Sequence, residues 1–407
     1  MTKKICIVGG GASGLYCAMQ LKLLNPSLDV AVLEKNPRVG KKLLATGNGK
    51  CNFTNSNQTP DAYKSEAPDK VNRILKAHTA EDICTAFKHI GIESTNKGEL
   101  IYPKSMQASA VLDALRFKLA HLGVTIETDF EVKSIRAEGT CFKIIGTTQK
   151  SADAVVIACG SNASGGSASG IKLLRSFGHT VTPLYPALVP VVCDTTNTKI
   201  AKGMRAQCKV TLCKNNKIVA SETGEVLFTD YGISGICIMQ LSGYISKSIA
   251  LNEKAAFHFE IDFMPELNTD TLLEHLKERR NTIGYMQTGE FLGGFLNKKI
   301  SQSVIKASAG IDLNAPACSL TDEQLIGLTS TLKRFALKIN GVLDAAHAQV
   351  CGGGALLDDF TDSLESKKQK NLYACGEVLD VVGDCGGYNL TWAWASAYAV
   401  AKYITDK

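Results

Sequence analysis

Residues 3–34 read KKICIVGGGASGLYCAMQLKLLNPSLDVAVLE, and this stretch decides the fold class. Residues 3–8 are a short apolar run that is typical of a buried strand. A glycine cluster follows, and apolar residues then recur at helical spacing down to about Asn25. Residues 29–34 form a second apolar run. Strand, glycine turn, helix and strand within about 30 residues make one βαβ unit, which belongs to a parallel sheet.

The glycine turn matches G-x-G-x-x-G at Gly9, Gly11 and Gly14. The first glycine permits a tight turn, the second lets a diphosphate approach the backbone, and the third lets the helix pack closely on the strand. Free N–H groups and the helix dipole favour a phosphate there. Glu34 follows at the spacing of an acid that accepts a ribose hydroxyl. The sequence therefore predicts a site for NAD or FAD, and Glu34 disfavours the extra 2′-phosphate of NADP.

Composition bounds the class of protein. The chain has 407 residues, 45% hydrophobic and 21% charged. Because single cores stop growing at about 250–300 residues, we expect at least two domains. The 45 basic residues against 39 acidic ones give only +6, without a basic stripe, so we expect no nucleic-acid partner. No apolar run reaches about 18 residues, so we expect no membrane insertion.

The fourteen cysteines include no C-x-x-C pair, and the chain opens without a signal-peptide pattern. We therefore expect reduced thiols and a cytoplasmic protein. The seven histidines show neither H-x-x-x-H nor H-E-x-x-H spacing, so no metal site is predicted. The sequence leaves the oligomeric state open.

The pattern of apolar and polar residues along the chain changes at the proline-rich segment 183–190. Residues 190–262 alternate as short strands and turns, and residues 266–335 carry mostly helical patterns. At 371–378 the chain again shows the apolar run of a buried strand. We predict an FAD-binding domain in two parts, 1–188 and 336–407, with a β-rich module at 189–265 and a helical module at 266–335.

The sequence resembles the BaiN-type NAD(P)/FAD-dependent oxidoreductases, a family that includes bile-acid enone reductases and aminoacetone oxidase-like flavoproteins. The segments that carry the resemblance are VGGGASG (8–14), VLEKNPRVGKKLLATGNGKCNFTN (32–55), GEVLFTDYGISG (224–235), LESK (364–367) and LYACGEVLDVVGDCGGYNLTWAWASAYAVA (372–401). The resemblance implies a glutathione-reductase-like Rossmann domain built from both chain ends, with inserted β-barrel-like and helical modules. It also implies non-covalent FAD in place of NAD at the fingerprint.

Together, the motifs and the resemblance assign a set of cofactor-binding residues. Glu377 ends a strand that delivers an acid to the ribityl chain, and residues 386–390 bring a helix N-terminus to the flavin, where its dipole favours negative charge. The predicted cofactor residues are Gly9, Gly11, Ala12, Ser13, Gly14, Glu34, Lys35, Lys41, Lys42, Gly47, Asn48, Gly49, Cys51, Asn52, Val132, Ala158, Cys159, Gly160, Gly376, Glu377, Gly387, Tyr388, Asn389 and Leu390.

Cys51 lies where disulfide reductases of this fold keep a redox pair, yet the next cysteine is Cys84. A flavin–disulfide relay is therefore not expected, and Cys51 is predicted to pack or to contact flavin. Lys41 and Lys42 either neutralise phosphate, steady the flavin, or are simply solvated. The catalytic acid stays open, and the polar candidates for it are Tyr102, Asp230, Tyr231 and Tyr388.

These observations predict a flavoenzyme that acts on a small molecule. The resemblance favours reduction of a C=C bond conjugated to a ketone, with NADH or NADPH as a transient electron donor. The opposite direction, in which an amine or aminoketone reduces FAD and oxygen yields hydrogen peroxide, remains an alternative. A non-catalytic FAD-binding scaffold or a nucleic-acid-associated protein is the rival from another class.

Overall fold

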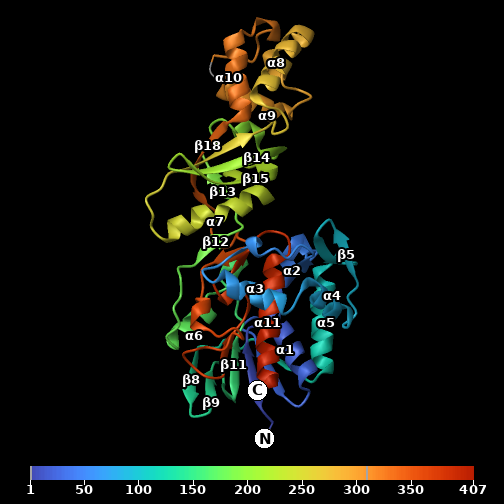
Figure 1. Ribbon diagram of the computed structural model, residues 1–407, viewed down its shortest axis with the longest axis vertical. Coiled ribbons are helices and arrows are strands. Elements are labelled where there is room, and N and C mark those ends of the chain that lie inside the picture. The colour runs from blue at the N-terminus through green and yellow to red at the C-terminus, as the bar shows by residue number, and fades with distance from the viewer. Residues whose placement is uncertain (1, 309) are drawn as a thin grey trace. The chain divides into compact units, whose positions relative to one another are not determined.

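A computed structural model describes residues 2–308 and 310–407. The chain divides into two compact units. Unit 1 comprises residues 1–185 and 349–407, and unit 2 comprises residues 186–348. Unit 1 is thus built from both chain ends, and its first and last segments appear blue and red in Figure 1.

The strands of unit 1 are β1 (Lys4–Val8), β2 (Asp29–Leu33), β3 (Thr54–Asn55), β4 (Tyr63–Lys64), β5 (Ser94–Lys97), β6 (Leu100–Pro103), β7 (Thr125–Glu127), β8 (Ser134–Glu138), β9 (Cys141–Ile145), β10 (Gln149–Ala152), β11 (Ala154–Ile157), β19 (Val350–Gly352), β20 (Leu372–Ala374) and β21 (Val382–Gly383). Its helices are α1 (Ala12–Leu24), α2 (Lys41–Ala45), α3 (Pro68–Lys76), α4 (Ala80–Lys88), α5 (Ala108–His121), α6 (Ser169–Ser176) and α11 (Tyr388–Asp406). A short strand, β12 (Tyr185–Ala187), spans the boundary between the units.

A five-stranded parallel sheet in the order β20-β11-β1-β2-β7 forms the centre of unit 1. The chain leaves β1 toward β2 on one side and later returns through β11 on the other. The strand order therefore reverses at β1, and ligands of open parallel sheets bind at the carboxyl ends of strands at such a point. Helices α1 and α11 pack against each other along the sheet (Figure 1), whereas β9 and β10 contact β11 and β1. The predicted Rossmann-type fold class is confirmed.

Unit 2 holds a closed six-stranded barrel in the order β13-β16-β15-β14-β17-β18. Its strands are β13 (Val191–Cys193), β14 (Arg205–Lys214), β15 (Lys217–Phe228), β16 (Gly232–Ser234), β17 (Phe257–Asp262) and β18 (Phe335–Val342). Its helices are α7 (Ile236–Ala250), α8 (Thr269–Ile283), α9 (Lys298–Ala307) and α10 (Asp322–Lys333).

Two features of unit 2 differ from the expected segments. Strand β18 pairs with β13 and β17 and so belongs to the barrel, although residues 336–348 were expected in the returning FAD domain. The region expected to hold only strands and turns also contains α7. That helix buries Ile238, Leu241 and Ile245 at helical spacing but also exposes Ile236 and Ile249, and these exposed apolar residues blur the buried stripe in the sequence.

Candidate functional site

The glycine fingerprint forms the turn between β1 and α1, at the carboxyl end of the central strand. Gly9 has a φ of 113°, and a Cβ there would lie 2.4 Å from the carbonyl oxygen of Ala158. A Cβ at Gly14 would lie only 1.9 Å from the carbonyl oxygen of Gly9. Gly11 differs, since a Cβ there meets no heavy atom within 4 Å. The outer two glycines are therefore required by packing, whereas Gly11 borders open space, as expected for the glycine that a diphosphate approaches.

Glu34 follows β2 directly and is buried beside this turn. Its Oε2 accepts a hydrogen bond from the Gly10 amide at 2.8 Å, and its Oε1 accepts from the Asn36 amide at 2.9 Å and from the Asn36 side chain. A carboxylate has about four acceptor sites, so one remains for a hydroxyl. The Phe130 amide donates to the Glu34 carbonyl, which brings the segment before the buried Val132 to the same edge.

A strained loop lies near the fingerprint in sequence and shapes the next part of the site. Gly47, Asn48, Gly49 and Cys51 all adopt positive φ, between 53° and 80°. Left-handed backbone is unstrained at the two glycines but costs energy at Asn48 and Cys51, and such strain persists only where the surroundings fix it, which occurs often at ligand sites. A Cβ at Gly47 would lie 3.6 Å from Cε1 of Tyr102, so that ring stands beside the loop.

The loop meets the N-terminus of α11. Asn55 donates to the carbonyl of Gly386 at 2.9 Å, and the hydroxyls of Thr54 and Thr391 lie 2.8 Å apart. A Cβ at Gly387 would lie 3.0 Å from Asn52 Oδ1, and that buried oxygen has no hydrogen-bond partner among the described residues. A buried acceptor without a donor is costly, so this oxygen fits a ligand N–H or O–H.

The turn that opens α11 is held by its own side chains. Asn389 Oδ1 accepts from the Gly383 amide at 2.8 Å, and Asn389 Nδ2 donates to the Gly383 carbonyl at 2.7 Å. Leu390 is half-buried, and Tyr388 is buried with its ring edge-on to Tyr63. The helix N-terminus is thereby fixed in place beside the loop.

Glu377 and Lys42, both predicted to bind cofactor, form an ion pair with a separation of 2.6 Å. The other oxygen of Glu377 accepts from the Cys351 amide at 2.9 Å. The Cys351 thiol in turn donates to Asn162 Oδ1 at 2.8 Å. Cys351 and Asn162 were missed in the sequence, because each lies outside a recognised motif and far along the chain from Glu377.

Gly376 joins this cluster to the fingerprint. A Cβ at Gly376 would lie 2.5 Å from the Ser13 hydroxyl, and its amide donates to Ser396 at 2.9 Å. Gly160 also has positive φ, and a Cβ there would lie 3.7 Å from Glu377 Oε2. Ala12 lies beside the fingerprint turn, whereas Lys35 and Lys41 lie near the site in sequence without a described polar partner.

The thiols of the site are held protonated. Burial raises the pKa of Cys51 to about 11 and that of Cys159 to about 12. Neither thiol is ionised at neutral pH, and the thiolate is the nucleophile. This agrees with a packing or contact role for Cys51.

The four candidate proton donors separate into two groups. Tyr102 and Tyr388 belong to unit 1, and burial raises the pKa of each, so both keep their proton at neutral pH. Asp230 and Tyr231 belong to unit 2. Asp230 is exposed and paired with Lys202, which lowers the pKa of the carboxyl, so it is ionised at neutral pH and cannot donate.

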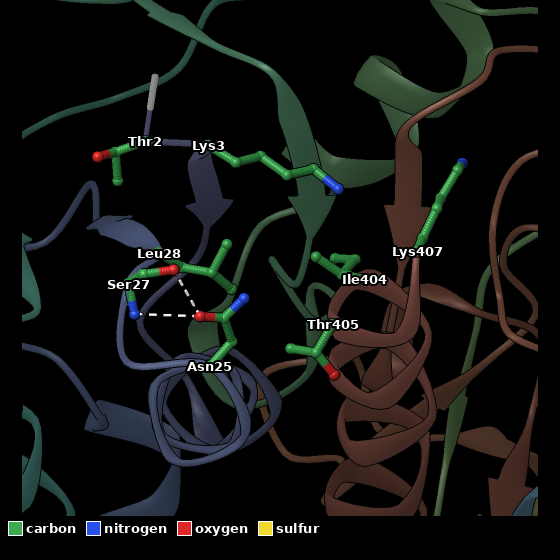
Figure 2. Close-up of a pocket in the computed structure, with 8 residues that line it drawn as sticks. All are labelled: Thr2, Lys3, Asn25, Ser27, Leu28, Ile404, Thr405 and Lys407. Atoms are coloured by element: carbon green, nitrogen blue, oxygen red, sulfur yellow. Dashed lines mark hydrogen bonds between the residues drawn. The ribbon is translucent and has the colours of Figure 1, made fainter.

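The Gly9–Gly14 turn, Glu34, the 47–52 loop, residues 376–377 and the N-terminus of α11 together form the candidate cofactor site, which we call the cradle. Two other polar features of unit 1 lie apart from this cradle. A pocket of about 540 Å³ is lined by Thr2, Lys3, Asn25 and Lys407 among others (Figure 2). Since Thr2 and Lys3 precede β1, this pocket lies at the amino end of the central strand, opposite the fingerprint. It is therefore not the dinucleotide site.

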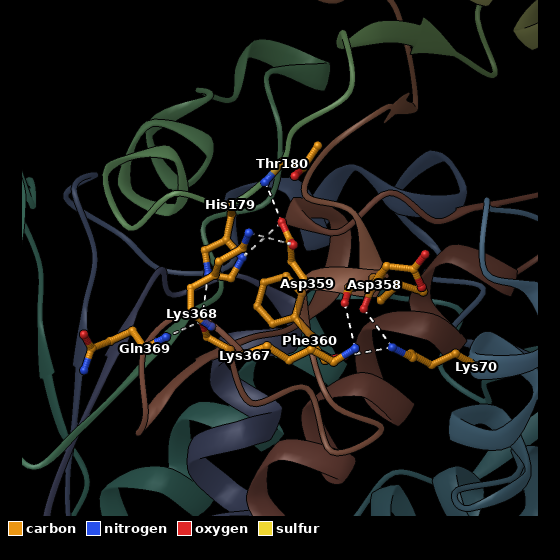
Figure 3. A network of polar contacts seen from close by, with 11 residues as sticks. Lys70, His179, Thr180, Asp358, Asp359, Phe360, Lys367, Lys368 and Gln369 are labelled. Atoms are coloured by element: carbon orange, nitrogen blue, oxygen red, sulfur yellow. Dashed lines mark hydrogen bonds and ion pairs between the residues drawn. The ribbon is translucent and has the colours of Figure 1, made fainter.

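The LESK segment takes part in a packing network (Figure 3). Ser366 lies 2.9 Å from His179 Nε2, and the His179 ring stacks on Phe360. Lys367 donates to the carbonyl of Asp358, and the buried Lys70 donates to the carbonyl of Phe360. These contacts satisfy the backbone of an irregular segment, and so this motif has a structural role.

The cradle fits FAD on observations of its own: open space at Gly11, a free acceptor direction on Glu34, and the unpartnered Asn52 oxygen. A glycine fingerprint at a sheet switch point, joined to a second strand and a helix from the far chain end, defines a dinucleotide-binding protein of the Rossmann class. The chain matches the HI0933-like protein Rossmann domain over residues 3–403 and belongs to that family. It is an FAD-dependent oxidoreductase.

Comparison with known proteins gives three full-length relatives. The chain is 36% identical to a 3-dehydro-bile acid delta(4,6)-reductase of Clostridium scindens over 409 residues, which cover 99% of each chain. It is 29% identical to a ribosomal RNA dihydrouridine synthase of Haemophilus influenzae, covering 98% of each. It is 28% identical to a protein of the same name from Escherichia coli K12, covering 97% of this chain and 96% of that one.

Two solved structures share the fold over the whole chain. A 3-ketosteroid delta1-dehydrogenase of Sterolibacterium denitrificans in complex with 1,4-androstadiene-3,17-dione matches with a TM-score of 0.50 at 12% identity, and the match covers 100% of both chains. Escherichia coli quinol fumarate reductase FrdA matches with a TM-score of 0.50 at 14% identity, covering 100% of this chain and 70% of that one. These likenesses support the fold.

No helix among residues 2–308 and 310–407 is long and apolar enough to cross a bilayer.

Proposed function

We propose that this protein reduces a C=C bond conjugated to a carbonyl group, with electrons from NADH or NADPH that reach the substrate through FAD. The observation that carries the proposal is the shared chemistry of the three full-length relatives. A delta(4,6)-reductase of 3-dehydro bile acids saturates a C=C bond conjugated to a ketone. A dihydrouridine synthase saturates the uracil C5=C6 bond, which is conjugated to the C4 carbonyl.

The residues of the cradle suit this direction of reaction. FAD, when bound, supplies a ring that accepts and passes on hydride. The N-terminus of α11 places partial positive charge in the cradle, whereas the charge of Lys42 is balanced by its ion pair with Glu377. Reduction of a conjugated C=C bond also requires a proton donor, and Tyr102 and Tyr388 hold their protons at neutral pH.

Tyr102 is the proton donor that we favour. Its ring stands beside Gly47 in the loop, whereas the Tyr388 ring is buried edge-on against Tyr63. Tyr102 is also less buried than Tyr388, so a substrate reaches it more readily.

A small enone is the substrate class that we propose first. The similarity is higher to the bile-acid reductase than to the rRNA enzymes. Basic and acidic residues are nearly balanced along unit 2, which contrasts with the clustered basic face of RNA-binding domains.

Uridine in ribosomal RNA is the second candidate substrate, because two full-length relatives carry that activity in their names. This candidate requires a nucleic-acid partner, contrary to the expectation from the charge of the chain. The fourteen cysteines are all free thiols, which supports a reducing compartment and hence a cytoplasmic location.

Anaerobic half-reactions test the proposal. NADH or NADPH is expected to bleach the oxidised flavin band, and a steroid enone is expected to restore it with one equivalent of saturated ketone. Restoration by uridine-containing rRNA fragments, but not by enones, moves the assignment to the second candidate. If amines bleach the flavin, while nicotinamides and both acceptors are inert, the protein is an oxidase and the proposal fails.

A further inference from the structure

We propose that unit 2 carries a zinc site formed by Cys213, His258 and Glu260 on the outer face of the barrel. The Sγ of the cysteine, a ring nitrogen of the histidine and a carboxylate oxygen of the glutamate all lie within 4.8 Å of one another. No described contact of the FAD cradle involves these residues.

The register of the barrel explains how the three side chains meet. Cys213 of β14 pairs directly with His258 of β17, and Thr211 pairs with Glu260. Directly paired residues share one face of a sheet, and residues two apart on one strand share it too. The neighbouring pair, Leu212 and Phe259, is fully buried in the core of unit 2. Cys213, His258 and Glu260 therefore occupy the opposite, outer face.

The donor set suits zinc. Thiolate, imidazole and carboxylate are the ligands that Zn²⁺ takes in proteins, with metal–ligand distances of about 2.0–2.3 Å. In a tetrahedral site such ligand atoms lie about 3.3–3.7 Å apart. His258 Nε2 is already 3.9 Å from Glu260 Oε1, so small side-chain rotations close the triangle. Three protein ligands leave a fourth position for water or another ligand.

Arg334 orients the Glu260 carboxylate and leaves one of its oxygens facing the site. Arg334 Nε lies 3.3 Å from Glu260 Oε2, while the other oxygen, Oε1, faces His258. An outer partner of this kind fixes a ligating carboxylate. Cys213 is 3% exposed, whereas the His258 and Glu260 side chains are 26% and 27% exposed. The thiol is thus shielded from bulk oxidants, and the metal enters from the side of the histidine and the glutamate.

Zinc binding releases one proton from the protein. The thiol of Cys213 loses H⁺ as the Zn–S bond forms, and Zn²⁺ with one thiolate and one carboxylate leaves the cluster without net charge. Nothing is oxidised or reduced. The bound ion joins β14 to β17 through side chains, in addition to their backbone ladder.

The test is calorimetric titration of the reduced, FAD-loaded enzyme with Zn²⁺ alone, combined with X-ray absorption at the zinc edge. We expect one equivalent to bind, with a sulfur scatterer at about 2.3 Å. Cys213→Ser is expected to remove that scatterer and weaken binding by about tenfold or more, and Glu260→Gln is expected to weaken binding with the sulfur retained.

Cys318→Ser is the matched control, because Cys318 is an exposed thiol of the same unit. It is expected to leave zinc affinity and the sulfur signal unchanged. The inference is overturned if wild-type enzyme binds no zinc, if the sulfur signal persists in Cys213→Ser, or if it disappears in Cys318→Ser. Normal FAD content and an unchanged melting temperature without zinc show that each variant is folded.

Discussion

Gly11→Val and Gly14→Ala are expected to damage the protein in opposite ways, although the two glycines belong to one fingerprint. A Cβ at Gly11 meets no protein atom within 4 Å, and this residue caps α1 with a φ of −84°, which any residue adopts. Loss of a glycine N-cap costs only a few tenths of a kcal/mol to about 1 kcal/mol. We therefore expect Gly11→Val apoprotein to melt within about 4 °C of wild-type apoprotein.

The same substitution should abolish tight FAD binding, since the valine side chain fills the space that the diphosphate needs. Losing two charge-assisted hydrogen bonds of about 1.5–3 kcal/mol each weakens binding by at least about 3 kcal/mol. That loss corresponds to about a hundredfold or more in Kd.

Gly14→Ala should instead disrupt the fold. Its Cβ would lie 1.9 Å from the Gly9 carbonyl oxygen, so α1 must move away from β1. Overpacking of this kind costs about 1–3 kcal/mol or more. Titration of each apoprotein with FAD, followed by flavin fluorescence, and thermal melting without FAD measure both effects. Normal FAD affinity in Gly11→Val, with the variant folded, would refute the assignment of the diphosphate site.

Three further predictions follow from particular side chains. Cys51→Ser should keep turnover within about tenfold of wild type, because the pKa of about 11 leaves no thiolate for catalysis; a loss of about a thousandfold with FAD bound would assign Cys51 to the chemistry. Tyr102→Phe should slow anaerobic reoxidation by the enone about 10²–10⁴-fold without changing flavin reduction by the nicotinamide, while Tyr244→Phe, an exposed control in unit 2, leaves both steps unchanged. His78 is buried against Tyr16, and burial lowers the pKa of its ring from 6.5 to about 4. The unfolded chain therefore binds the extra proton first, and stability should fall by up to about 3 kcal/mol as pH drops from 6.5 to 4. Urea unfolding of His78→Gln should show a smaller fall over that range, and an identical pH dependence would contradict the neutral buried histidine.

The sequence predicted the parts of the fold that local pattern determines. The βαβ unit, the glycine turn and Glu34 lie within 34 residues, and their roles depend on backbone sterics that glycine and spacing reveal. Helix α7 was missed because exposed apolar residues, such as Ile236 and Ile249, blur its buried apolar stripe. Strand β18 was assigned to the wrong segment because its partners, β13 and β17, are distant in sequence.

The residues of the candidate site fall into the same two groups, those that local sequence pattern reveals and those that depend on contacts between distant segments. Motif residues such as Gly11 and Gly376 were predictable from the turns that they form. The contacts of Glu377 with the Cys351 amide, and of Cys351 with Asn162, join segments far apart in the chain, and a single sequence does not show such pairings. The cluster of Cys213 with His258 escaped the search for histidine spacing for the same reason, because its members come from two strands.

The identity of the cofactor in the purified protein tests the central claim most directly. The claim is that the Gly9–Gly14 turn and Glu34 hold the adenosine diphosphate half of FAD. Heating the protein, removing the precipitate and separating the released compound by chromatography identifies the cofactor and its amount. We predict FAD, close to one equivalent per chain. FMN or NAD in stoichiometric amount would contradict the account, because FMN lacks the half that this turn is built to hold and NAD lacks the flavin.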